Sequence, residues 1–292
     1  MLSAFGNSLK IPELRKRILF TLGLIFICRV IANIPTPGVD STALREFITG
    51  MQRTAGGSFL GLYDLFSGGA LRRFSVGSLG IMPYISASII IQLLTAVIPA
   101  FERLAREGDA GREKITQYTR YLTVLICVVQ GYAMAVVMQN PEQLGINKQI
   151  VMIPGIGYIL MTIMTLTTGT MLMMWLGEQI TERGIGNGIS MIITVNIVSR
   201  LPGALQAAIN MFKPVDGVVQ FTVFHLIGLV VMIFLVIAGV IAVTQAQRKI
   251  PVQYAKRVVG RKMYGGQSTY MPLRVNYSGV MPIIFAQAIL MF

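Results

Sequence analysis

The chain has 292 residues, of which 54% are hydrophobic and only 13% are charged, against roughly 25% charged residues in an average soluble domain. This composition excludes an ordinary soluble domain and indicates a membrane protein. The formal net charge is +13, and because charges are costly inside a bilayer, we expect the excess in the loops.

Hydrophobic segments, taken in chain order, predict seven membrane spans. The first resembles a signal peptide, with a basic stretch before an apolar run, but Arg29 follows the run and no small-x-small cleavage site appears. We therefore expect an uncleaved first span. Arg200 and Pro202 interrupt the fifth span. The seven predicted spans are residues 18–34, 75–98, 121–138, 151–176, 188–208, 219–244 and 275–292.

The placement of Lys and Arg predicts the orientation of these spans. Basic residues are concentrated before the first span and in the loops 99–120 and 246–274, whereas segment 139–150 carries only Lys148 and segment 209–218 only Lys213. Cytoplasmic segments carry the Lys and Arg excess in membrane proteins. We therefore expect a cytoplasmic N-terminus.

The long connection between the first two spans contains an amphiphilic patch at residues 57–71. Gly68 and Gly69 follow its apolar residues and are expected to end a short helix and to act as a hinge. The patch is either an interfacial helix on the membrane surface or a re-entrant element surrounded by protein. Its apolar residues fall on one helix face at positions i, i+3, i+4 and i+7: Phe59, Leu62, Tyr63 and Phe66.

An uncharged run of 28 residues, 74–101, follows the patch. As one helix it is long enough to cross the roughly 30 Å hydrocarbon core of a bilayer. It is not a plain apolar anchor, because Pro83 lies in its interior and polar residues are embedded in it. Such residues usually face protein or a water-filled path, so we expect this span to face a functional interior. The polar residues are Ser75, Ser78, Ser86, Ser88 and Gln92.

Isoleucines repeat every four residues in the second and fifth spans. Each set forms one stripe down a helix. The stripes are either ordinary packing or lipid-facing surface, or the lining of a hydrophobic constriction that gates by excluding water. The two sets are Ile81, Ile85 and Ile89, and Ile185, Ile189 and Ile193.

Enzyme motifs are not found in the sequence. It contains no Walker A run, no HExxH and no GxSxG, and we expect neither an enzyme nor a bound cofactor or metal ion. The glycines between Gly184 and Gly188 are expected to let a cytoplasmic turn pass closely into the fifth span. Coupled transporters usually keep carboxylates inside their spans, and the predicted spans contain no Asp or Glu, which disfavours a small-solute carrier.

Five blocks of sequence resemble the SecY family, the channel subunits of the bacterial Sec protein translocon. They are spread along the chain and are not generic membrane sequence. The blocks are Phe66–Leu71, Leu79–Leu94, Gly111–Arg120, Trp175–Ser190 and Tyr254–Arg257.

The resemblance implies an all-α polytopic fold, a helical channel of ten spans of which this chain holds about seven. Residues 1–210 would form the N-terminal half, with a plug at 57–71 that folds back into the pore. Residues 211–292 would begin the C-terminal half. The implied pore ring is aliphatic, and the implied lateral gate lies between spans two and seven. The ring residues are Ile81, Ile85, Ile189, Ile193 and Ile284, and the plausible gate residues are Ser86, Ser88, Gln92 and Gln130.

By the same resemblance, the chain is expected to move unfolded secretory proteins across the bacterial cytoplasmic membrane and to release membrane segments laterally into it. A small-solute membrane carrier remains the alternative. The implied partners are the SecE and SecG subunits, the SecA motor or the ribosome, signal sequences, nascent polypeptides and lipid. Loop 246–274 would dock SecA or ribosomal RNA through Arg248, Lys249, Lys256, Arg257, Arg261 and Lys262.

Overall fold

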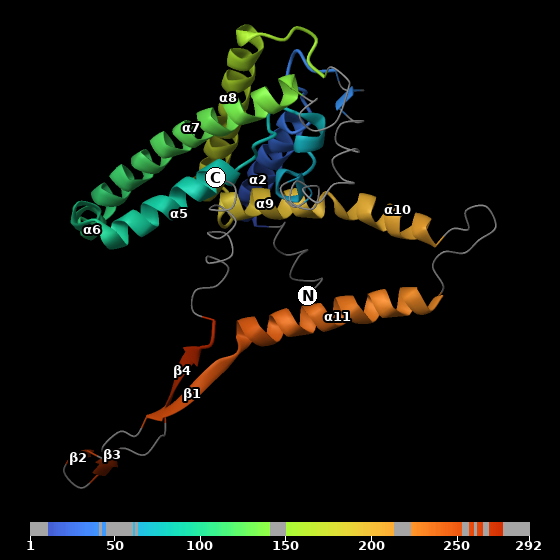
Figure 1. The fold of residues 1–292 in the computed structure, drawn as a ribbon. Helices are drawn as coiled ribbons and strands as arrows, with labels where there is room; N and C mark the ends of the chain where they lie inside the picture. The colour runs from blue at the N-terminus through green and yellow to red at the C-terminus, as the bar shows by residue number, and fades with distance from the viewer. Residues whose placement is uncertain are drawn as a thin grey trace. The chain divides into compact units, whose positions relative to one another are not determined.

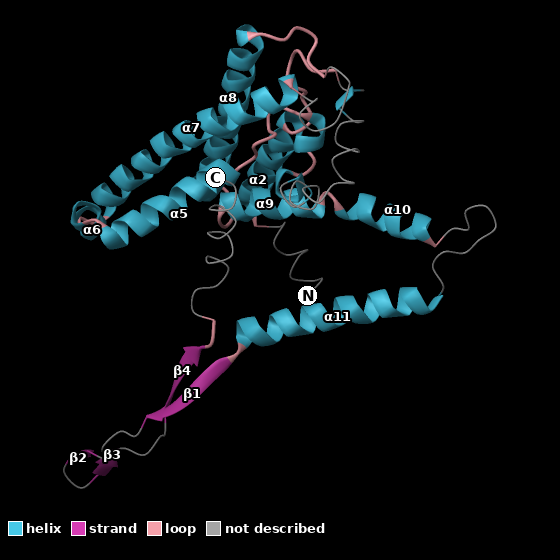
Figure 2. Cartoon of the chain, viewed as in Figure 1, coloured by secondary structure: helices cyan, strands magenta, loops and turns pink. Residues whose placement is uncertain are grey.

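The computed structural model describes residues 11–40, 43–44, 61, 64–140, 150–212, 223–252, 257–259, 262–264 and 269–276 (Figure 1). The chain divides into two compact units, Met1–Leu205 and Gln206–Phe292. Helices make up most of the described residues, and the second unit also contains short strands (Figure 2).

The described elements are helical segments and four short strands, and the strands form two two-stranded sheets. The helices are α2 (Pro12–Ile31), the 3-10 turn η1 (Leu71–Arg73), α5 (Met82–Val97), α6 (Pro99–Arg106), α7 (Asp109–Gln139), α8 (Ile156–Arg183), α9 (Gly188–Val198), α10 (Leu201–Met211) and α11 (Val223–Gln245). The strands are β1 (Gln247–Val252), β2 (Arg257–Val259), β3 (Lys262–Tyr264) and β4 (Thr269–Arg274).

The uncharged run 74–101 is not one helix, so the prediction of a single continuous helix across it was wrong. Residues 74–81 form turns, and α5 begins only at Met82, with Pro83 in its first turn. Proline suits this position because backbone N–H groups in the first turn of a helix have no intrahelical acceptor. A residue without an N–H therefore loses no helix hydrogen bond there. At the other end, α5 breaks at Ile98 and the chain bends by 100° into α6.

Four described helical segments are long and apolar enough to cross a membrane, or five if the bent pair α5 and α6 counts as one span. The four are Asp109–Gln139, Ile156–Arg183, Gly188–Met211 and Phe224–Gln245. Helix α2 lies at the predicted first span but also contains the charged residues that precede it. The predicted seventh span, 275–292, lies almost entirely outside the described residues. The chain is thus a multi-pass membrane protein.

In the first unit, α7 packs against α5 and α8, and α8 packs in turn against α2 and α9. Two apolar cores result. One lies around Phe74, Cys127 and Leu166. The other lies around Ile81, Met173 and Ile192, and it is this second core that holds the candidate site.

The backbone of residues 34–40 joins two parts of the first unit that are distant in sequence. On one side the Val76 amide donates to the Ile34 carbonyl at 2.9 Å, and on the other the Asp40 amide donates to the Ile150 carbonyl at 3.0 Å. Short antiparallel bridges at Pro35 and Ser75 and at Val39 and Val151 accompany these bonds. Segment 34–40 is therefore bonded to the turns before α5 at one end and to the residues before α8 at the other.

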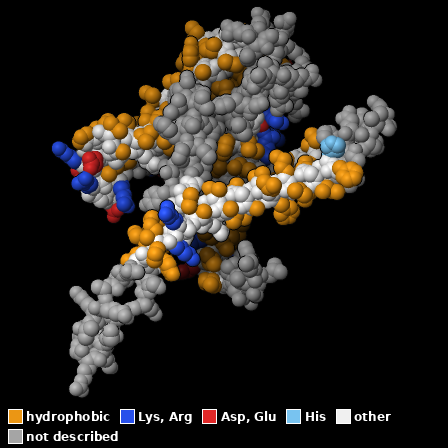
Figure 3. All heavy atoms as spheres, turned by 60° about the horizontal axis from the view of Figure 1, so that its bottom comes forward, with side chains coloured by type: hydrophobic (Ala, Val, Ile, Leu, Met, Phe, Trp, Pro, Cys, Tyr) orange, Lys and Arg blue, Asp and Glu red, His pale blue; other side chains and the backbone are white. Residues whose placement is uncertain are grey.

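The second unit contains α11 and two hairpins. Hydrophobic side chains run along α11 (Figure 3), and its described side chains are exposed within this chain. A helix that is apolar all round is typical of a membrane span. After it, β1 pairs with β4 in antiparallel register, with Lys249 opposite Pro272, and β2 pairs with β3.

Candidate functional site

Four isoleucines of the predicted pore ring pack in one apolar core. We call Ile81, Ile85, Ile189 and Ile193 the isoleucine cluster. Ile81 is 1% exposed, and the other three are partly buried against the same core. The fifth predicted ring residue, Ile284, lies outside the described residues.

Two helix starts bring the isoleucine cluster together. Ile81 and Ile85 lie at the beginning of α5, and Ile189 and Ile193 lie in the first turns of α9. Asn187 caps α9 by accepting a hydrogen bond from the Ser190 amide at 3.1 Å. A Cβ added at Gly188 would overlap the carbonyl oxygen of Gly177 in α8. The glycine at this turn therefore allows the close approach that the sequence predicts.

The segment just before η1 lies next to this core. Residues 64–67 are helical, and the helix ends at Gly68 and Gly69, whose φ angles are 67° and 91°. Residues other than glycine rarely adopt such backbone angles. A Cβ at Gly68 would also lie 2.5 Å from Nη1 of Arg29. The next residue, Ala70, is fully buried in the same core as Ile81. We call residues 64–70 the hinge segment.

The predicted plug is only partly described. Phe59, Leu62 and Tyr63 lie outside the described residues, and Phe66 is half-buried. The hinge segment itself is packed among protein, because Asp64 is 3% exposed and Ser67 is 1% exposed.

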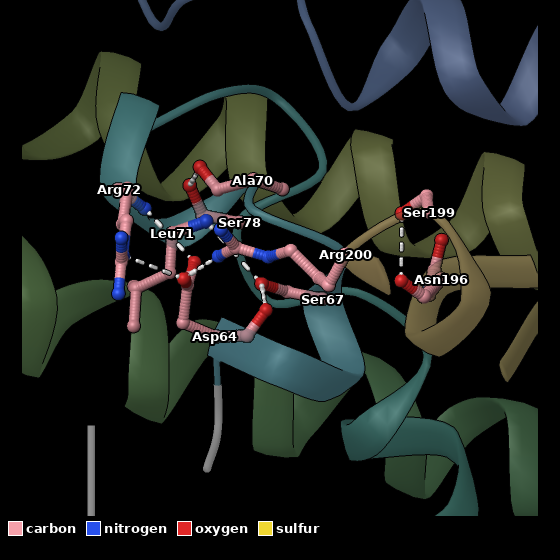
Figure 4. A network of polar contacts seen from close by, with 9 residues as sticks. All are labelled: Asp64, Ser67, Ala70, Leu71, Arg72, Ser78, Asn196, Ser199 and Arg200. Carbon is pink, nitrogen blue, oxygen red and sulfur yellow. Dashed lines mark hydrogen bonds and ion pairs between the residues drawn. The ribbon is translucent and has the colours of Figure 1, made fainter. Parts of the chain in front are cut away.

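Asp64 is a buried carboxylate with three donors around it (Figure 4). Its Oδ1 accepts from the backbone amide of Arg72 at 3.2 Å, and its Oδ2 lies 2.9 Å from Nε of the same arginine. The guanidinium of Arg200, which follows α9, also forms an ion pair with Oδ2. A buried charge is tolerated only when it is paired and hydrogen-bonded, and Asp64 meets both conditions.

Asn196, which lies one helical turn before Arg200, also contacts the hinge segment. Its Nδ2 donates to the carbonyl of Phe66 at 2.9 Å, and its Oδ1 accepts from Nη1 of Arg29 at 2.9 Å. The side chain is 1% exposed. Both ends of this buried amide are satisfied, and the amide links α2 and α9 to the backbone of the hinge segment.

Serine hydroxyls complete the turns on either side of the glycines. Ser67 Oγ donates to the Asp64 carbonyl at 3.1 Å and accepts from the Leu71 amide at 3.3 Å. Ser78 Oγ lies within hydrogen-bond distance of the carbonyls of Ala70, at 3.2 Å, and Ser75, at 2.7 Å. The turns around the hinge segment are thus bonded locally, independently of α9.

Three of the predicted lateral-gate residues lie on α5 and the fourth lies on α7. On α5, Ser86 is buried, Ser88 is half-buried and Gln92 is exposed. Gln130 lies on α7, and its Oε1 is buried without a hydrogen-bond partner among the described residues. Within those residues, no hydrogen bond joins two of the four side chains. The seventh span, which would form the other side of the gate, is not described.

Four of the predicted docking residues lie on described strands of the second unit. Arg248 and Lys249 are exposed on β1. Arg257 begins β2, and Lys262 begins β3. Lys256 and Arg261 lie outside the described residues.

Sequence reasoning missed the residues that hold the hinge segment. It treated Arg200 only as an interruption of a span and did not single out Asp64 or Asn196. One signal was available, since Asp64 is the only acidic residue in the amphiphilic patch at 57–71. A lone carboxylate among apolar residues needs a cationic partner if it is buried.

The described residues contain no cluster of His, Cys, Asp and Glu that could hold a metal ion. Cys28 and Cys127 are free thiols in apolar surroundings. The side chains of the isoleucine cluster carry no charge and no hydrogen-bonding group.

Comparisons with known proteins agree on one family. Residues 75–292 match the SecY family model. The protein translocase subunit SecY of Streptomyces griseus is 47% identical over 293 residues, which cover 99% of this chain and 65% of that protein. The corresponding subunit of Mycobacterium tuberculosis (strain ATCC 25618 / H37Rv) is 45% identical over 291 residues, or 99% of this chain and 64% of that one. The chain spans about two thirds of the length of these relatives.

Solved structures show the same fold. A structure described as a protein conducting channel matches with a TM-score of 0.55 and 18% identity, over 94% of this chain and 56% of that one. Sec61 in the canine ribosome-channel complex from the endoplasmic reticulum matches with a TM-score of 0.51 and 17% identity, over 94% and 56%. At these identities the likeness concerns the fold alone.

Proposed function

This chain belongs to the SecY family, and from that premise we propose that it forms the N-terminal part of a protein-conducting channel. The channel passes unfolded secretory proteins across the membrane and releases hydrophobic segments sideways into the lipid. The observation that carries the proposal is the isoleucine cluster, in which two helix starts bring four aliphatic side chains into one core.

A ring of such side chains suits a channel whose cargo has no fixed sequence. Aliphatic groups exclude water and ions by making the constriction hydrophobic. They offer no charge or hydrogen bond that would trap a passing segment. Ile284 is the fifth ring residue in this proposal, contributed by the seventh span.

Residues 57–71 form the plug, with Gly68 and Gly69 as its hinge. In support, these glycines have backbone angles that favour glycine, and Ala70 lies in the same core as the isoleucine cluster. The plug closes the idle channel and moves aside for a signal sequence. Ser86, Ser88, Gln92 and Gln130 are polar contacts of the lateral gate, where weak interhelical bonds of roughly 0.6–2 kcal/mol would permit opening.

The basic hairpins dock the ribosome or the SecA motor on the cytoplasmic side. Loop 246–274 has seven Lys and Arg residues and no Asp or Glu, which suits the phosphates of ribosomal RNA. The N-terminus is cytoplasmic, the membrane is the bacterial cytoplasmic membrane, and SecE and SecG complete the complex.

A transport assay tests this function against that of a small-solute carrier. The full-length protein, with its partner subunits, is reconstituted into vesicles together with the SecA motor. We expect uptake of an unfolded preprotein that depends on its signal sequence. Uptake of amino acids or sugars with no preprotein uptake would contradict the proposal.

A further inference from the structure

Helix α9 and the arginine that follows it hold the hinge segment at two adjacent points. Asn196 binds the Phe66 carbonyl, and Arg200, four residues later, pairs with Asp64. Residues four apart lie on the same side of a helix, so both contacts come from one side of this helical region. The same α9 supplies Ile189 and Ile193 to the isoleucine cluster. The element that lines the proposed ring thus also holds the proposed plug.

Asp64 further bridges the two glycines. It precedes Gly68 and Gly69, whereas its partner Arg72 follows them. Rotation about the glycines would separate Asp64 from Arg72 and from Arg200 together. The hinge is therefore held closed by one carboxylate with two guanidinium partners.

The charge balance makes this contact costly to break. The Asp64 side chain is 4% exposed and that of Arg200 is 28% exposed. Removing one partner of a buried ion pair leaves an uncompensated charge, which is strongly destabilising. If the hinge segment moves, both ions must find water or another partner. Opening thus has an electrostatic cost. The signal sequence must offset this cost by binding the open state more tightly than the closed state.

We propose that the Asp64–Arg200 ion pair, supported by the Asn196–Phe66 hydrogen bond, sets how strong a signal sequence must be to open the channel. The inference rests on the proposed function, since it assigns this contact to the plug hinge of that channel. A strongly apolar signal sequence offsets the loss of the pair, and a weak one does not. The pair is a specificity-determining contact and touches no cargo.

The test compares two preproteins in the full-length channel. One has an intact signal sequence, and in the other a charged residue interrupts the apolar segment of the signal. The measured quantity is the ratio of defective-signal to intact-signal translocation. In Arg200→Gln and in Asp64→Asn this ratio should rise on the order of tenfold, within the range typical of coupling between two sites. The double variant should add little to Asp64→Asn, because Asp64→Asn already removes the ion pairs of Asp64 with both Arg72 and Arg200.

Arg73→Gln is the matched control. It removes the same charge close by, but Arg73 is exposed and has no ion pair among the described residues. Its ratio should equal that of the wild type. If Arg200→Gln fails to assemble, Asn196→Ser removes the hydrogen bond to Phe66 and should raise the ratio in the same direction.

The outcomes separate the two levels of the proposal. If the wild-type protein moves neither preprotein, the proposed function fails. If it moves the intact one and the ratios of Arg200→Gln, Asp64→Asn and Asn196→Ser all stay at the wild-type value, the inference is overturned. An equal rise in Arg73→Gln would also overturn it, because general charge loss would then explain the effect.

Discussion

At the scale of single residues, the site divides into apolar and ionic parts with different tasks. The isoleucine cluster interacts through shape and exclusion of water, whereas Asp64 interacts through charge with named partners. Ion pairs of this kind are specific but costly to separate. Apolar contacts are non-directional and adapt to different side chains.

A charge placed in the isoleucine cluster should open it to ions. Ile85→Lys and Ile193→Lys each place an ammonium group in the proposed apolar constriction. The charge attracts water into the constriction. We expect an increased ion leak in planar bilayers without preprotein. Thr194→Lys, at the exposed neighbour of Ile193, is the control and should leave the leak unchanged. Wild-type conductance in both isoleucine variants would contradict their place in the constriction.

At the scale of elements, the β1–β4 hairpin gives the basic loop a defined scaffold. In its register, Arg248 lies opposite Leu273 and Lys249 opposite Pro272. The two cations are therefore held on a paired strand.

Reversing these two charges tests the docking role. Arg248→Glu with Lys249→Glu should weaken ribosome binding and make it less dependent on salt. The slope of log K against log salt should fall by roughly 0.7–0.9 for each phosphate that the protein no longer neutralises. Arg15→Glu with Lys16→Glu, exposed at the start of α2, makes the same charge change elsewhere and is the control. Equal affinity of the hairpin variant and the wild type at every salt concentration would rule out the role.

At the scale of the whole molecule, the sequence predicted the long apolar helices better than the segments between them. Helices α7, α8 and α11 lie where hydropathy placed spans, although α7 and α8 extend further into charged sequence. The predicted start of the helix that contains α5 was wrong because apolar composition does not distinguish a helix from buried turns. Pro83 was the local clue to a helix start.

The candidate site was predictable only in part. The four-residue repeat of isoleucines left packing and a constriction both open, and the resemblance to the SecY family singled out the four residues of the cluster. The paired glycines marked the end of the short helix at residues 64–67. The contacts of Asp64 and Asn196 were not predictable, because Asn196 and Phe66 are 130 residues apart. Such pairings depend on how α2, α8 and α9 pack, which no local pattern encodes.

A protein-conducting channel of this kind requires that a polypeptide passes through the isoleucine cluster, and site-specific photocrosslinking can detect that passage. A photoreactive residue is placed at Ile85 or Ile193 in the full-length channel, and a preprotein is stalled during translocation. Leu160, 58% exposed on α8, is the control position. We predict crosslinks to the preprotein from both isoleucine positions and none from Leu160. Active translocation without crosslinks from either isoleucine position would show that the polypeptide takes another path.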